Sequence, residues 1–156
     1  MSTITSDHFT QALYELLDEA FDNVHGHFLD PGDSLFTTLA GISAELASIP
    51  VGGKCATLAA QVKHVAYYLD VVVQSVRAPA DPGADWEAIW RTVKGVTPQE
   101  WQEIQVELRL SYERIKALIA ETPAWESADQ IAGAMALVAH TAYHLGEIRQ
   151  ALCVLK

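Results

Sequence analysis

The chain has 156 residues, the length of one domain, so we expect a single domain over residues 1–156. Half of the residues are apolar, which allows a sizeable core without disulfides. Twenty acidic against ten basic side chains give a formal net charge of −10. This charge argues against sequence-independent binding to nucleic acid or to an anionic membrane, since both require a basic surface.

The two cysteines, Cys55 and Cys153, exclude a disulfide framework and a Cys-rich zinc ribbon, and we expect both to be small core residues. The first seven residues have neither the basic nor the apolar region of a signal peptide. The longest nearly apolar stretch, residues 131–146, is too short to span a bilayer. We therefore expect a cytoplasmic protein with no membrane partner.

The first predicted helix extends from about Asp7 to Val24, where leucine and phenylalanine recur at helical spacing. Ser6 or Asp7 is expected to cap its start, and Gly26 is expected to take the left-handed conformation at its end. A shorter helix is predicted over residues 34–47.

The second long helix is predicted to begin at residues 55–57 and to extend to about Val76, because Pro79 cannot continue it. A short helix with two of the four tryptophans is predicted within residues 84–92. The link between the second and third long helices is long enough for a crossover connection.

The third long helix has the clearest start signal. Thr97 is the expected N-cap, Pro98 takes the first helical position, and Glu100 completes a capping box. The fourth helix is predicted to begin after Ser127, and it is apolar on most sides, which predicts burial on most sides. Four long amphipathic helices and no strand predict an all-α four-helix bundle with one or two additional short helices.

Three histidines on these helices are candidate metal ligands. His140 and His144 are four residues apart in the most apolar helix, so their side chains share one face, about 5–6 Å apart. His64, in the second helix, can supply a third nitrogen if the two helices are neighbours. Three protein ligands leave coordination positions open, as in catalytic sites. The alternative is three core histidines with ordinary hydrogen-bond partners.

Other motifs are weaker. The His140–His144 segment lacks the glutamate of a zinc protease, and no Glu-x-x-His motif supports a di-iron site. Glu147 shares the histidine face and is a candidate fourth ligand, ligand partner or base, or a solvated glutamate paired with an arginine. His25 and His27 with Asp30 form a competing cluster, which the helix dipole alone can explain.

Two segments carry a family resemblance. Residues 58–69, with His64, and residues 139–150, with His140, His144 and Glu147, resemble the DinB-like (YfiT-like) metalloenzyme superfamily, whose fourth helix has His-x-x-x-His followed by Gly-Gln-Ile. The resemblance implies a bundle that holds a divalent metal, often nickel or zinc, on His64, His140 and His144, and frequent dimers. Characterised relatives include isomerases and transferases that use a low-molecular-weight thiol. This chain departs from the pattern at Glu147, where the family commonly has glutamine.

Three functional hypotheses follow. The first is a metal-dependent thiol transferase, isomerase or hydrolase that acts on a small molecule, with Glu147 as the catalytic proton acceptor. The second is a metal-binding bundle without catalysis that serves as a sensor or interaction module. The third is a purely structural bundle. A self-complementary apolar stripe on the fourth helix predicts a homodimer.

Overall fold

The computed structural model describes residues 3–53, 55–78 and 83–155, and every regular element in those ranges is helical. The four long helices are α1 (Ser6–Phe21), α4 (Leu58–Arg77), α6 (Pro98–Ala120) and α7 (Ala128–Leu155). The short elements are α2 (Leu35–Leu39), α3 (Ala44–Ala47), the 3₁₀ turn η1 (Val51–Gly53) and α5 (Ala88–Thr92). The prediction of an all-α fold with four long helices is confirmed for the described residues.

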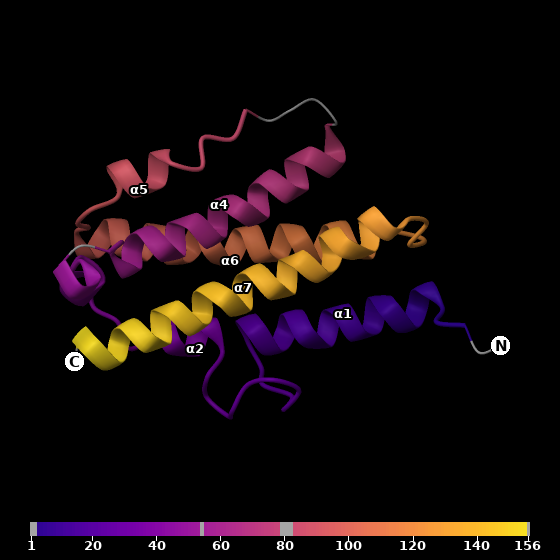
Figure 1. Ribbon diagram of the computed structural model, residues 1–156, viewed down its shortest axis with the longest axis horizontal. Helices are drawn as coiled ribbons and strands as arrows, with labels where there is room; N and C mark the ends of the chain where they lie inside the picture. The colour runs from indigo at the N-terminus through magenta and orange to yellow at the C-terminus, as the bar shows by residue number, and fades with distance from the viewer. Residues whose placement is uncertain (1–2, 54, 79–82, 156) are drawn as a thin grey trace.

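The long helices pack as a bundle (Figure 1). α4 and α6 run parallel to each other, and α1 and α7 run in the opposite direction. Contacts join α4 to α6, α6 to α1, α1 to α7 and α7 to α4, so each helix has two neighbours. The link from α4 to α6 includes α5 and leads to the start of α6 beside the start of α4, which is the crossover connection that the length of this link allows.

The start of α6 is confirmed in detail. The Thr97 side chain accepts from the backbone N–H of Glu100, and the Glu100 carboxylate accepts from the backbone N–H of Thr97. Pro98 occupies the first turn, where its missing N–H costs no hydrogen bond. α4 likewise begins where the sequence predicts, with Thr57 as its N-cap.

The boundaries of α1 differ from the prediction. Its N-cap is Thr5, and the helix ends at Phe21 rather than near residue 24. Gly26 has the expected positive φ of 84°, but it lies in the following loop. Glu19 explains the early end: its buried carboxylate accepts four backbone N–H bonds from residues 25, 27, 28 and 29, which turn the loop back onto the helix.

The predicted helix over residues 34–47 is two helices, α2 and α3. The chain turns at Ala40 and Gly41, and Ser43 caps α3 by accepting from the backbone N–H of Leu46. A serine N-cap competes with continuation of a helix, which is why one apolar pattern divides into two short elements.

Two burial predictions are wrong. Cys55 and Cys153 are both exposed rather than in the core, because one precedes the N-cap of α4 and the other faces outward on α7. α7 also exposes Met135 and Tyr143, at 59% and 62%, so one of its faces is open in the single chain.

Among the described residues, no helix combines the length and apolarity needed to cross a membrane.

Candidate metal centre

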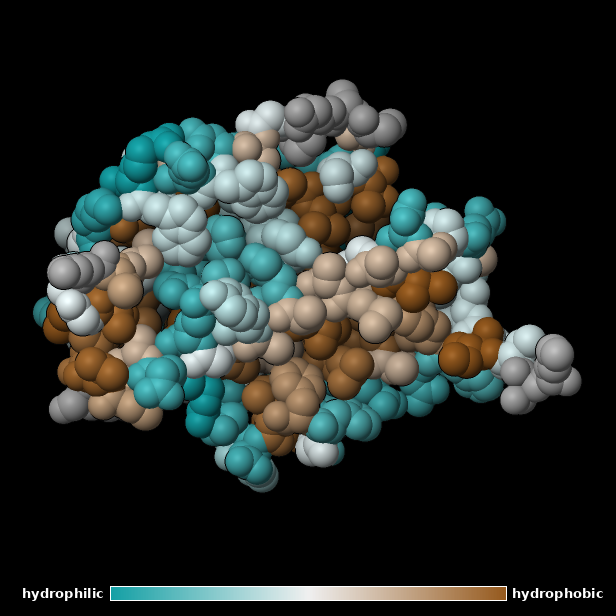
Figure 2. All heavy atoms as spheres, in the orientation of Figure 1, coloured by the Kyte–Doolittle hydropathy of each residue, from teal (hydrophilic) through white to brown (hydrophobic). Residues whose placement is uncertain are grey.

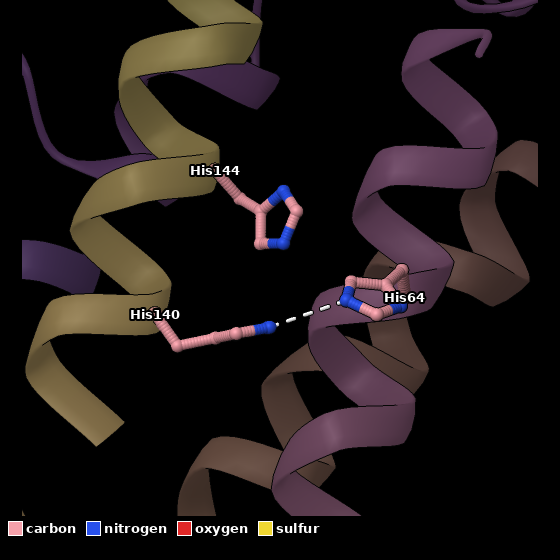
Figure 3. Close-up of side chains that lie close together, drawn as sticks. All are labelled: His64, His140 and His144. Atoms are coloured by element: carbon pink, nitrogen blue, oxygen red, sulfur yellow. Dashed lines mark hydrogen bonds between the residues drawn. The ribbon is translucent and has the colours of Figure 1, made fainter. Parts of the chain in front are cut away.

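The three predicted histidines meet between α4 and α7 (Figure 3). His64 comes from α4, while His140 and His144 come from successive turns of α7. One nitrogen from each ring lies within 4.8 Å of the other two, and the Nε2 atoms of His64 and His140 are 3.2 Å apart. Because α4 and α7 pack antiparallel, the early turns of α4 lie beside the middle of α7 and bring the three rings together.

Two hydrogen-bond acceptors, one from α4 and one from α7, fix the orientation of the His144 ring. Its Nδ1 lies 2.7 Å from Gln61 Oε1 on α4 and 2.9 Å from Glu147 Oε2 on α7. Both oxygens are acceptors, so Nδ1 carries the proton and donates it to them. Nε2 of His144 therefore keeps its lone pair. Partners of this kind commonly orient metal-ligating histidines and fix their tautomer.

The three rings are in the protonation state that a metal requires. Burial, reinforced by the neighbouring His144, lowers the pKa of His64 to about 4, although Glu147 acts in the opposite direction. Burial and the two neighbouring imidazoles lower the pKa of His140 to about 3. Burial also lowers the pKa of His144, against the opposing effect of Glu147. At neutral pH the rings are uncharged, and no proton has to leave before a cation binds.

The donor set fits a divalent cation. The Nδ1 atoms of His64 and His140 are buried, and neither has a hydrogen-bond partner among the described residues. Because Nε2 of His64 faces Nε2 of His140 and Nδ1 of His144 is already engaged, a shared ion would bind the three Nε2 atoms and leave each Nδ1 to carry the proton of its ring. Three neutral imidazoles suit zinc and nickel. Within the described residues, no other group of three His, Cys, Asp or Glu side chains converges in this way.

Aromatic rings enclose the histidines. Trp90 lies 4.6 Å from the His64 ring and Trp86 lies 6.2 Å from it, between ring centroids. Tyr68 stacks on His140 with centroids 3.7 Å apart. No local sequence pattern indicates which tryptophans reach the site, because α5 and its preceding turn are brought over α4 only by the crossover connection. These rings displace water and strengthen electrostatic interactions inside the site.

The competing histidine cluster does not form. His25 Nε2 lies 2.8 Å from Asp18, and His27 Nε2 lies 3.5 Å from Glu15, so each histidine pairs with an acid of α1. Glu147 lies where the sequence predicted, on the histidine face of α7. Gln61 was missed as a partner, although its position three residues before His64 places it on the same face of α4.

Comparisons with known proteins do not identify this site: the chain matches no family model, no curated protein and no solved structure. The three-histidine arrangement therefore stands on its own geometry.

The two acceptors of His144 should tune metal affinity. We expect Gln61→Leu and Glu147→Leu each to weaken zinc binding by up to about tenfold, and the double variant by about 10–100-fold, because only the double variant leaves Nδ1 without an acceptor. Competition with a chromogenic chelator measures the affinities. Glu15→Leu is the control, because Glu15 lies on α1 and pairs with His27 rather than with the site. Unchanged affinity in the double variant would contradict the orienting role.

Proposed function

We propose that this protein is a metal-dependent enzyme of the DinB-like kind that acts on a small molecule, as a thiol transferase, isomerase or hydrolase. The observation that carries the proposal is the convergence of three neutral histidines, one of them oriented by a carboxylate and an amide. Nickel and zinc are the ions that we expect His64, His140 and His144 to hold.

A divalent cation on three imidazoles supplies a positive charge that acidifies a water or thiol ligand toward neutral pH. Three protein ligands leave room for such a ligand, which a closed four-ligand site does not. The described site residues include no nucleophilic serine or cysteine, and both cysteines are exposed elsewhere. We therefore infer that the nucleophile is a solvent molecule or a thiol cosubstrate.

Glu147 is the carboxylate that we assign to proton transfer. One carboxylate oxygen of Glu147 accepts a hydrogen bond from His144 Nδ1. The Glu147 side chain is 36% exposed, so its carboxylate can exchange protons with solvent. The rings of Trp90 and Tyr68, packed on His64 and His140, limit the access of bulk water to these two histidines. The glutamate stands where the family commonly has glutamine, so glutamine at this position keeps the acceptor for His144 and removes only the proton acceptor.

Turnover tests the proposal. Activity screening of the metal-loaded protein with thiol and ester substrates should yield a reaction that metal removal abolishes. In that reaction, Glu147→Gln is expected to lower kcat by about 10²-fold or more, since a positioned base contributes about 10²–10⁴-fold. Glu126→Gln, at an exposed position before α7, is the control. Full activity of the metal-free protein would overturn the proposal. Full activity of Glu147→Gln would show that Glu147 is not the proton acceptor and that its role is limited to the contact with His144.

We further propose that the protein forms a two-fold dimer through the exposed face of α7. Met135 and Tyr143 lie on this face and expose apolar surface that water solvates poorly. Light scattering at micromolar concentration should give twice the chain mass of 17.0 kDa, and Met135→Glu should give the monomer. A wild-type monomer would contradict the proposal.

A further inference from the structure

An apolar cleft lies beside the metal centre, between the C-terminal half of α4, the end of α6 and the start of α7. Its volume is about 430 Å³, within the range of small-molecule pockets. Figure 2 shows apolar side chains in the hollow between the end of α4 and the start of α7, next to a polar region farther along these helices. The apolar lining includes Val72, Val76, Leu118, Ile119, Ala134 and Leu137.

The cleft and the metal centre share a wall. Tyr68 stacks on the His140 ring and also lines the cleft. Along α4, His64, Tyr68, Val72 and Val76 are successive residues of one helical face, each four positions apart. At 1.5 Å per residue, the distance from His64 to Val76 is about 18 Å. A single elongated molecule can therefore occupy the cleft and reach the histidines.

Three polar groups of the cleft are already engaged within the chain. The hydroxyl of Ser75 donates to the carbonyl oxygen of Val72, and the hydroxyl of Thr122 donates to the carbonyl oxygen of Leu118. The indole N–H of Trp125 donates to Thr10 Oγ1, outside the cleft, which leaves the ring as apolar surface. Asp129 is exposed at the rim and disfavours an anionic group there. The cleft therefore suits an uncharged apolar ligand and offers few directed hydrogen bonds.

We propose that this cleft binds the uncharged, apolar body of an amphiphilic substrate whose polar head reaches the three-histidine centre. The inference rests on the proposed function and specifies its substrate class. Recognition comes from burial of apolar surface, so affinity should rise about three- to fourfold with each buried methylene.

Two glycines of α7 provide a matched test. Gly133 lines the cleft, and a Cβ atom at this position would meet nothing within 4 Å. A leucine there fits the helix and adds a bulky side chain at the wall of the cleft. Gly146 is exposed on the same helix and has equally open surroundings, but it does not line the cleft. Gly146→Leu is therefore the control for Gly133→Leu.

The first arm of the test uses the zinc-loaded protein. Isothermal titration calorimetry compares acetohydroxamic acid with octanohydroxamic acid, which share a metal-binding head and differ by six methylenes. We expect the longer compound to bind at least about 100-fold more tightly, because its chain enters the cleft. Gly133→Leu should abolish this difference without weakening acetohydroxamic acid, and Gly146→Leu should retain it. Equal affinities in the wild-type protein would overturn the inference while leaving the metal centre intact.

The second arm uses the metal-free protein and the uncharged fluorophore N-phenyl-1-naphthylamine. We expect the fluorophore to bind, and we expect Gly133→Leu to weaken binding at least tenfold. Binding that Gly133→Leu leaves unchanged would overturn the inference. If zinc fails to bind while Gly133→Leu still blocks the fluorophore, the proposed function falls and the apolar site is supported. A dimer that binds no fluorophore and dissociates in Gly133→Leu would assign the cleft to a second copy instead.

Discussion

His144→Ala is expected to abolish stoichiometric metal binding. The substitution removes one of three nitrogens that lie within 4.8 Å of one another. It also leaves Gln61 and Glu147 without the imidazole that they orient. The remaining pair, His64 and His140, supplies only two ligands. Because loss of an orienting partner alone costs about 10–100-fold in affinity, we expect loss of a ligand to cost at least about 100-fold.

Mass spectrometry of the protein under native conditions, after zinc or nickel loading, measures this effect. One ion per chain is expected in the wild-type protein and none in His144→Ala. His27→Ala is the control, because His27 is exposed and pairs with Glu15 rather than with the site. Unchanged metal content in His144→Ala would refute the assignment of this residue as a ligand.

The metal-free protein is expected to lose stability as the pH falls from 6.5 to 4. The pKa values of His64 and His140, about 4 and about 3, lie below the value of about 6.5 in the unfolded chain. The unfolded chain therefore binds more protons in this window, and lowering the pH favours unfolding. After discounting the shifts by half for partial solvent exposure, we expect a loss of about 3–4 kcal/mol.

Urea unfolding at a series of pH values in the presence of a chelator measures this loss. His140→Phe should shrink the loss in this pH window, whereas His27→Phe should not. Burial alone would raise the pKa of Glu19, but four backbone hydrogen bonds lower it to about 2. The contribution of Glu19 to the stability of the fold is therefore complete above about pH 4.5 and decreases only in more acidic solution. Stability that stays constant from pH 6.5 to 4 would contradict the burial of the histidine rings.

The sequence predicted the parts of the fold that depend on local signals. Thr97, Pro98 and Glu100 specify a helix start within four residues, and the structure confirms the start that they predict. The four-residue spacing of His140 and His144 places both rings on one face whatever surrounds the helix. Their meeting with His64 required one tertiary assumption, that α4 and α7 are neighbours, and this contact is present.

Features that depend on long-range packing were harder to predict from the sequence. Glu19 ends α1 early through backbone N–H groups of residues 25–29, and no local motif announces this contact. Trp90 reaches His64 only through the crossover connection. The cleft beside Tyr68 arises where α4, α6 and α7 meet, so no single helix pattern reveals it. An exposed apolar stripe on α7 was expected, but the residues that form it were not identified, because apolar composition does not show which side of a helix its neighbours cover.

A crystal structure of the zinc- or nickel-loaded protein, with anomalous data collected on both sides of the metal absorption edge, tests the central claim most directly. We predict one anomalous peak per chain between α4 and α7, bonded to a nitrogen of each of His64, His140 and His144 at about 2.0–2.1 Å for zinc, with at least one coordination position held by a non-protein ligand. A peak elsewhere in the chain, or none after loading at neutral pH, would contradict the metal centre.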